Sequence, residues 1–115
     1  MRLYLFIVLS IFIVIVPAHA KSPLSDAEKE GIKERGEISA IAEWCGLDWL
    51  GRSFKPFMKR LRQKGFPEKK MTFVGVYHGR YMQRKIMDLE EGSRTCAQSD
   101  IDKISEHLSK KKSDK

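Results

Sequence analysis

Only two cysteines occur in the 115-residue chain, Cys45 and Cys96, and their redox state limits the folds that the segment between them can adopt. In an oxidising compartment, an even pair of cysteines in a small chain predicts a disulfide. That bond would close a loop of about 51 residues and would stabilise the fold by about 4 kcal/mol in the chain-entropy model. The alternatives are two free thiols and a bond between two chains.

The N-terminal sequence MRLYLFIVLSIFIVIVPAHA indicates the compartment. Arg2 gives a short positive region, residues 3–16 are almost entirely apolar, and residues 18–20 form an A-x-A cleavage site. This is the layout of a secretory signal peptide. The apolar run is shorter than the roughly 20 residues of a membrane-spanning helix, and an uncleaved anchor is the alternative. We therefore expect residues 1–20 to be a signal peptide and the protein to be exported, to a periplasm or else secreted.

The chain that remains is long enough for one domain. We expect this domain at residues 21–112, followed by a charged tail at 113–115. Apolar residues recur at helical spacing, which predicts an all-α fold of about four helices pinned by the disulfide. Ser25 and Glu28 have the spacing of a capping box at the start of the first helix. Gly46 would end this helix.

A second helix is predicted over residues 54–64. Proline is tolerated in the first turn of a helix but not in its interior, and Pro56 would lie in that turn. Ser53 would then be the N-cap. Gly65 suits the left-handed position after the helix, where Phe66 would pack back on the last turn.

A third helix is predicted from Pro67 to Gly92, with proline in its first turn. The stretch MTFVGVY at residues 71–77 is rich in β-forming residues, so a strand is the alternative there. A helix is favoured because the apolar residues of this segment fall on one continuous stripe. Ser99 would cap a fourth helix.

The apolar faces of the four predicted helices together give the expected core. It consists of Ile38, Ile41, Trp44, Leu47, Leu50, Phe54, Phe57, Leu61, Val74, Met82, Ile86, Ile101, Ile104 and Leu108.

Positive charge is concentrated in the middle of the chain. Cleavage of the signal peptide would remove one charged residue, Arg2. The remaining chain has 21 Lys and Arg against 15 Asp and Glu and a net charge of +6. Residues 52–70 hold one acid, Glu68. A basic block attracts anionic partners such as lipid headgroups or lipopolysaccharide phosphates, and nucleic acid is not an expected partner here. The alternative is that these residues form a solvated helix face without a binding role. The anion-binding candidates are Arg52, Lys55, Lys59, Arg60, Arg62, Lys64, Lys69 and Lys70.

The segment MTFVGVYHGRYM, which begins at Met71, combines glycines, a histidine and methionines. On a helix, Gly75 and Gly79 would share one face, where small residues let another backbone approach, so we expect a helix-packing seam there. His78 and Met82 would lie on the same side as Met71, and imidazole with thioethers is a ligand set for copper(I). The spacing lacks the dense repetition of copper carriers, and we expect packed core residues, no metal and no cofactor.

Catalytic residues are not grouped in a usable pattern. A nucleophilic Ser or Cys needs a neighbouring base. Both cysteines are expected in the disulfide, and Ser53 and Ser99 are expected as helix caps. The adjacent carboxylates Glu90 and Glu91 would point apart on a helix. We therefore expect a protein that is not an enzyme.

Three segments resemble the small periplasmic acid-stress chaperones of the HdeA type: EWCGLDWLGRSFKP, KGFPEKK and RTCAQSDIDKISEHLSKKK. In that family a first cysteine can follow a tryptophan, as Cys45 follows Trp44, and the second precedes a lysine-rich final helix, as Cys96 does. The middle of this chain is more basic than in the family. The resemblance implies a short exported all-α fold with one disulfide and a chaperone function.

The main functional expectation is a non-enzymatic periplasmic interaction protein, with a holdase-type stress chaperone as its specific form. In acid, 15 carboxylates would be neutralised while 21 bases and two histidines carried charge, so the net charge would rise toward about +23 and favour loosening. The partners would be protein clients or an envelope protein, and a homodimer is compatible with this. The alternative is a binder of anionic envelope components through residues 52–70.

Overall fold

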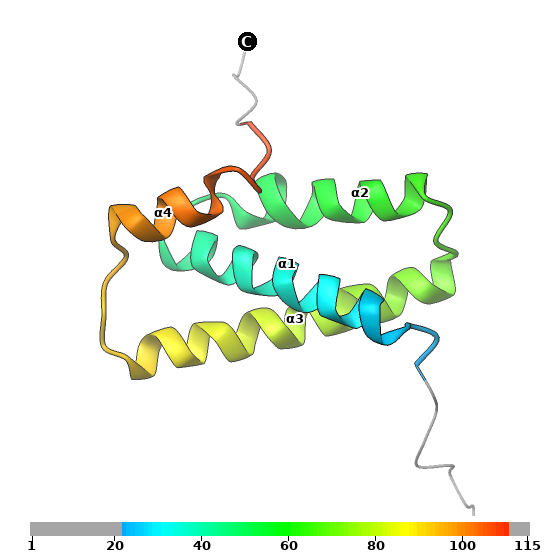
Figure 1. The fold of residues 1–115 in the computed structure, drawn as a ribbon, viewed down its shortest axis with the longest axis horizontal. Coiled ribbons are helices and arrows are strands. Elements are labelled where there is room, and N and C mark those ends of the chain that lie inside the picture. The colour runs from blue at the N-terminus through cyan, green and yellow to red at the C-terminus, as the bar shows by residue number, and fades with distance from the viewer. Residues whose placement is uncertain (1–21, 111–115) are drawn as a thin grey trace, which may run out of the picture.

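The computed structural model describes residues 22–110, so the predicted signal peptide and the tail at 113–115 lie outside it. Within this range the chain forms four α-helices and one short π-helix, as Figure 1 shows, which confirms the predicted all-α fold. No helix in the described part is both long and apolar enough to cross a membrane. The elements in chain order are α1 (Asp26–Trp44), the π-helix η1 (Leu50–Phe54), α2 (Lys55–Gln63), α3 (Glu68–Glu91) and α4 (Gln98–Ser105).

The two long helices α1 and α3 pack along one another and form the centre of the fold. In the view of Figure 1, α1 lies between α3 below and the shorter helices α2 and α4 above. η1 runs directly into α2 and also contacts α1, and α4 contacts α1. The chain therefore packs α3, η1 and α4 against α1.

The start and end of α1 agree with the sequence prediction. Ser25 Oγ accepts a hydrogen bond from the backbone N–H of Glu28 at 3.1 Å, and Glu28 Oε1 accepts one from the backbone N–H of Ser25 at 2.9 Å. This reciprocal pair is a capping box, which satisfies two N–H groups that a helix start otherwise leaves without partners. After α1 the chain turns at Gly46, whose φ of +71° suits glycine.

The predicted N-cap role of Ser53 is wrong. The chain is already helical through η1, and Ser53 is buried there with its Oγ 2.7 Å from Ser39 Oγ. Pro56 lies just after the junction of η1 and α2, so helical residues precede it. Its missing N–H would ordinarily bond the carbonyl of Arg52. That carbonyl accepts the backbone N–H of Ser109 instead, at 2.8 Å.

The end of α2 follows the predicted pattern. Gly65 has a φ of +91°, and its N–H donates to the carbonyl of Arg62 at 3.0 Å. The N–H of Phe66 donates to the carbonyl of Leu61 at 3.1 Å, which completes a Schellman motif. The Phe66 ring is half-buried and packs against the core.

α3 is a continuous helix of 24 residues, so the strand alternative for its first half is wrong. Pro67 is its N-cap rather than its first helical residue, and Gly92 is its C-cap. The stripe of apolar residues faces the interior, because Met71, Val74 and Met82 are all buried on it. Gly92 does not adopt the left-handed conformation with which a glycine commonly ends a helix. The left-handed residue here is Ser93, with a φ of 48°.

The core contains two clusters, one with Ile32 from the first half of α1 and one with Ile38 and Ala42 from its second half. Ile38, Leu61, Val74, Met82 and Ile104 are buried as predicted, and most of the other predicted core residues are half-buried. Leu50 is a correction: its side chain is 41% exposed, because η1 turns it outward. The first cluster contains Leu24, Ile32, Met58, Leu61, Met71 and Val74. The second contains Ile38, Ala42 and Ile104.

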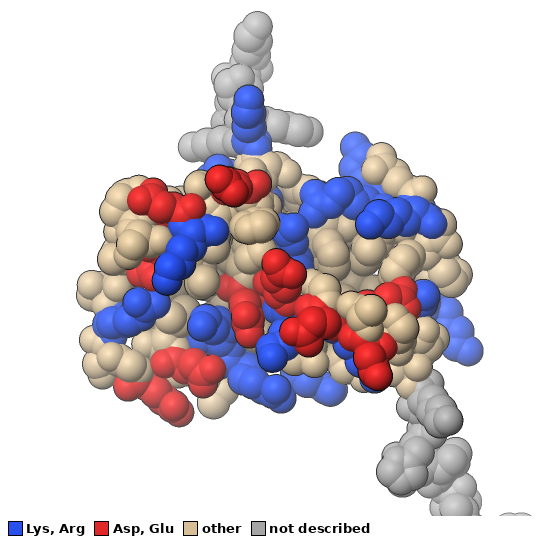
Figure 2. All heavy atoms as spheres, in the orientation of Figure 1, with Lys and Arg blue, Asp and Glu red and all other residues tan. Residues whose placement is uncertain are grey.

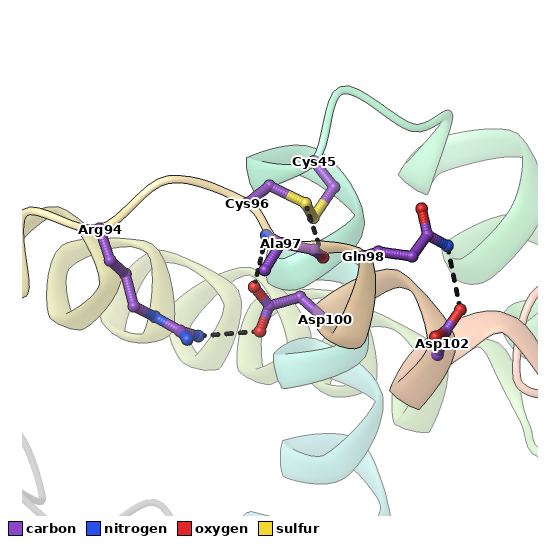
Figure 3. Close-up of a disulfide and its surroundings, with 7 residues drawn as sticks. All are labelled: Cys45, Arg94, Cys96, Ala97, Gln98, Asp100 and Asp102. Atoms are coloured by element: carbon purple, nitrogen blue, oxygen red, sulfur yellow. Dashed lines mark hydrogen bonds and ion pairs between the residues drawn. A yellow bond between two sulfur atoms is a disulfide. The ribbon is translucent and has the colours of Figure 1, made fainter.

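The disulfide joins the end of α1 to the segment before α4, as Figure 3 shows. Cys45 and Cys96 are bonded, with their Cα atoms 5.2 Å apart, which confirms the predicted pairing. This cross-link holds the start of α4 against α1. The buried Ile104 fixes the same helix from its inner face.

The start of α4 differs from the prediction, because its N-cap is Ala97 and not Ser99. Asp100 performs the capping: its Oδ2 accepts the backbone N–H of Ala97 at 2.9 Å, and its Oδ1 accepts a bond from Arg94 Nη2 at 3.0 Å (Figure 3). The Ala97 N–H, together with the charge of Arg94, holds the pKa of Asp100 below its usual range. Ser99 is exposed.

Candidate anion-binding surface

Five cations of the predicted basic block project from α2 and the residue that follows it. Figure 2 shows Lys and Arg side chains along the upper right of the molecule, where Figure 1 places α2, and a band of acidic side chains crossing the centre over α1. The spacing of these cations along a short helix puts them on its solvent side, because Met58 and Leu61 take the buried side. All five are exposed: Lys55, Lys59, Arg60, Arg62 and Lys64.

Three members of the predicted set have partners of their own. Lys70 Nζ lies 2.7 Å from Glu28 Oε2, and this contact, together with the Ser25 N–H, holds the pKa of Glu28 below its usual range. Arg62 Nε lies 3.5 Å from Glu68 Oε1 in an exposed pair, which stabilises little. Arg52 Nε donates to the carbonyl of Ser109 at 2.8 Å. Among the described residues, no carboxylate lies within ion-pair distance of the remaining candidates Lys55, Lys59, Arg60, Lys64 and Lys69.

Arg35 of α1 belongs to the same surface, although no local sequence pattern indicates it. Arg35 and Arg60 line one hollow between α1 and α2, and burial, followed by the charge of Arg60, lowers the pKa of Arg35. The Arg35 guanidinium lies 5.6 Å from the centre of the Phe57 ring, and its Nη1 donates to the carbonyl of His107 at 2.8 Å. Arg35 precedes the basic block by 17 positions, and only tertiary packing brings it there.

Arg35, Arg60 and Lys64 line a hollow of about 160 Å³ between α1 and α2. Glu34 is the one acidic residue on its walls. The charge of Glu34 raises the pKa of Arg35 and opposes the effect of Arg60. Three cations thus share this hollow with one acid. Like charges in a partly enclosed space repel one another, and a bound anion would relieve that repulsion.

A second polar cluster lies in the interior where α1, η1 and α3 meet. Ser39 Oγ is 2.7 Å from Ser53 Oγ and 2.8 Å from His78 Nε2, so the three side chains form a hydrogen-bonded chain. The two serines are fully buried and His78 is 2% exposed. The His78 ring packs on Phe54, with 4.6 Å between ring centres, and stacks on Trp49 at 6.1 Å.

The surroundings of His78 keep its imidazole neutral. Burial, and to a smaller extent the charge of Arg35, lowers the pKa of His78 to about 4. Ser39 can satisfy Nε2 of a neutral ring but offers no negative charge to a protonated one. Serines beside a histidine are the residue types of a hydrolytic site, but these three side chains do not reach the surface. Their contacts support a structural role.

The copper candidates His78, Met71 and Met82 are all buried on α3. One of the two ring nitrogens that could bind a metal, His78 Nε2, is already hydrogen-bonded to Ser39. The described part of the chain has no group of three or more His, Cys, Asp or Glu side chains placed to hold a metal ion. Packing and hydrogen bonding account for these positions, and the copper alternative is not tested by them.

The close helix contact is made by Gly36 and not by Gly75 and Gly79. A Cβ atom at Gly36 would lie 2.9 Å from Tyr81 Cβ and 3.0 Å from the carbonyl oxygen of His78. At Gly75 and Gly79 a Cβ atom would meet nothing within 4 Å, so the predicted seam is wrong. The small residue of the α1–α3 contact is therefore on α1 and not on α3.

Comparison of the chain with protein-family models, with curated proteins and with solved structures finds no match in any of the three.

Proposed function

We propose that this protein is an exported, non-enzymatic interaction protein that binds anionic envelope components, such as lipid headgroups or lipopolysaccharide, through the exposed cations of α2. One observation carries the proposal: four exposed cations of α2 and of the residue that follows it have no ion-pair partner among the described residues, namely Lys55, Lys59, Arg60 and Lys64. The disulfide is compatible with an oxidising compartment, and we propose the periplasm.

Electrostatics gives the expected strength of this binding. Each Lys or Arg near an anionic membrane surface contributes about 1 kcal/mol. Four such residues would together change the affinity by roughly two to three orders of magnitude. In Figure 2 the acidic side chains lie over α1 and the cations of α2 lie along the upper edge of the molecule, so the protein would approach the membrane with α2 foremost.

Vesicle binding tests the proposal. The exported protein is mixed with vesicles of neutral lipid alone or with added anionic lipid, and the bound fraction is measured by flotation. We expect binding only to anionic vesicles. Replacing Lys55, Lys59, Arg60 and Lys64 by Gln should weaken it about a hundredfold or more.

The matched control removes the same number of positive charges outside α2. In it, Gln replaces four exposed cations of α3, α4 and the segment after α4: Arg80, Arg84, Lys103 and Lys110. Binding reduced tenfold or less in this variant would support a surface on α2. Equal losses in both variants would show a response to net charge alone and would contradict the proposal, as would equal binding of the unaltered protein to neutral and anionic vesicles.

A holdase-type chaperone is the second candidate, and the buried His78 favours it. An imidazole that is neutral in the fold but charged in the unfolded chain destabilises the fold as the pH falls. The hydrogen-bond partner of the ring is Ser39 from α1, which Ser53 from η1 contacts in turn, and the cation Arg35 is nearby. None of these groups offers a negative charge to the protonated ring. Loosening in acid would expose the aromatic and methionine side chains of the core to protein clients.

A client-aggregation assay at neutral and acid pH tests this second function. Protection by exposed apolar surface should appear only in acid and should persist in high salt. An absence of protection at every pH would remove the chaperone function. The unaltered protein should protect clients only in acid, whereas a variant with a loosened core should also protect them at neutral pH. This pair of results would show that the activity depends on unfolding.

A further inference from the structure

A groove between α1 and α2 extends from the basic side chains of α2 into an apolar hollow. The hollow has a volume of about 410 Å³, and it adjoins the basic hollow of about 160 Å³. The two share Gly31 of α1 and Phe57, Leu61 and Lys64 of α2 and its end, so they form one continuous groove. One end is apolar and the other is cationic.

The apolar end is open because of a glycine. Gly31 lies on the groove wall in the interior of α1, and a Cβ atom there would meet nothing within 4 Å. Glycine costs up to about 1 kcal/mol relative to alanine in a helix interior, so this residue is not favoured by helix stability. The surrounding walls are supplied mainly by Ile32, Phe57, Leu61 and Phe66.

The cationic end carries the charges already described. Arg35 uses one of its five N–H donors on the carbonyl of His107, which leaves others for a ligand. Arg60 and Lys64 line the same hollow without a carboxylate in ion-pair distance among the described residues. Glu34 at the rim and Glu28, which is paired with Lys70, are the acids of the groove.

We propose that this groove binds a single-chain anionic amphiphile, with its alkyl chain along Gly31, Ile32 and Phe66 and its carboxylate or phosphate group at Arg35, Arg60 and Lys64. This proposal rests on the proposed binding of anionic envelope components and names the class of molecule that the surface accepts. The apolar end of the groove would hold the alkyl chain of such a ligand, and the cationic end would hold its anionic group.

The size of the groove selects one alkyl chain. Ligand sites have volumes of about 300–1,000 Å³, and the apolar hollow lies near the lower end of this range. A helix with its side chains is about 10–12 Å across, so several turns of an amphipathic peptide do not fit in this volume. A lipid with two chains would leave one chain outside.

Calorimetric titration of the exported protein tests the proposal with probes kept below their micelle concentrations. The probes are laurate, dodecyl phosphate, dodecyltrimethylammonium and inorganic phosphate. We expect binding of laurate or dodecyl phosphate, and at least about tenfold weaker binding of the cationic amphiphile and of phosphate alone. The two anionic probes distinguish a carboxylate from a phosphate ligand. Equal binding of the cationic and anionic amphiphiles would contradict the proposal.

Gly31→Leu is the decisive variant, because it fills the groove from a position with free space and raises helix propensity. Gly79→Leu is its control, since Gly79 is equally open but lies on α3 away from the groove. We expect Gly31→Leu to weaken laurate or dodecyl phosphate binding by about tenfold or more and Gly79→Leu to leave it unchanged. Equal affinities in the two variants would overturn the proposal.

Arg60→Gln tests the cationic end separately. This variant should bind the anionic probes more weakly and should bind dodecyltrimethylammonium no more weakly than the unaltered protein does. An equal loss of affinity for all probes would contradict a charge-selective site.

Vesicle binding separates this proposal from the proposed function. A protein that binds anionic vesicles but none of the single-chain probes lacks the groove site and keeps the α2 surface. A protein that binds neither lacks both.

Discussion

Arg52 and Ser109 form a reciprocal pair of hydrogen bonds across 57 positions of sequence. The backbone N–H of Ser109 donates to the carbonyl of Arg52 at 2.8 Å, and Arg52 Nε donates to the carbonyl of Ser109 at 2.8 Å. Because Pro56 has no N–H for that carbonyl, the segment after α4 completes the hydrogen bonding at the start of α2. Arg35 donates to His107 in the same segment at 2.8 Å. This segment is thereby fixed to α1 and η1.

Arg52→Ala should loosen the segment after α4. The lost hydrogen bond involves a charged donor in a half-buried position and contributes about 1.5–3 kcal/mol. We expect faster amide hydrogen exchange at Ser109, with exchange in the middle of α3 unchanged. Lys55→Ala, which alters an exposed side chain beside it, should change stability by less than about 0.5 kcal/mol. Unaltered protection at Ser109 in Arg52→Ala would show that the pair does not hold the segment.

Gly36→Ala and Gly79→Ala should have opposite effects on stability. The new methyl group at Gly36 would meet Tyr81 Cβ and the His78 carbonyl, and overpacking of this kind typically costs about 1–3 kcal/mol. At Gly79 the methyl group meets nothing, and replacement of a helical glycine gains about 0.5–1 kcal/mol. Urea unfolding measures both free energies. A stabilised Gly36→Ala protein would contradict the close contact between α1 and α3.

The stability of the fold should decrease between about pH 6.5 and pH 4 because of His78. Its pKa is about 4 in the fold and about 6.5 in the unfolded chain, so within this window only the unfolded chain takes up the proton. The shift corresponds to a loss of order 3 kcal/mol, complete near pH 4. The lowered pKa values of Glu28 and Asp100 act in a different window, because their stabilisation is lost as the pH falls below about 4.

Urea unfolding as a function of pH, for the unaltered protein and for His78→Gln, measures this effect. Gln retains hydrogen-bonding groups for Ser39 and does not titrate. The variant should be less stable at pH 7 and should lose less stability between pH 6.5 and pH 4. The same pH dependence in both proteins would show that His78 is not the titrating group.

Reduction of the Cys45–Cys96 bond should lower the free energy of unfolding by about 4 kcal/mol in the chain-entropy model. Chemical denaturation with and without reductant gives this difference. The Cys45→Ser, Cys96→Ser double variant should unfold like the reduced protein and should not respond to reductant. A reductant effect of equal size in the double variant would assign the loss to something other than the disulfide.

Local patterns in the sequence were sufficient to predict several elements. The capping box of Ser25 and Glu28 and the glycine turn at Gly65 depend on residues within a few positions of one another, and both are present. The apolar stripe of α3 was strong enough to outweigh its β-forming residues, since packing overrides propensity. The disulfide followed from the number of cysteines and the expected compartment.

The features that the sequence did not reveal depend on distant partners. Ser53 has the residue type and position of an N-cap, but its side chain bonds Ser39, which is 14 positions away. Periodicity identifies which face of a helix is buried but not where two helices come closest, so Gly36 was missed. The basic block was visible as composition, whereas the hollow that Arg35 shares with Arg60 depends on how α1 and α2 are placed.

The salt dependence of binding to anionic vesicles tests most directly the central claim, that the unpaired cations of α2 bind anionic envelope surfaces. The dissociation constant is measured for the exported protein between 0.1 M and 1 M salt, a range in which the Debye length falls from about 10 Å to about 3 Å. We predict that the affinity falls steeply over this range, and that the variant lacking Lys55, Lys59, Arg60 and Lys64 has a markedly smaller dependence on salt. Affinity that is unchanged at 1 M salt, or a salt dependence that is the same in the variant, would contradict it.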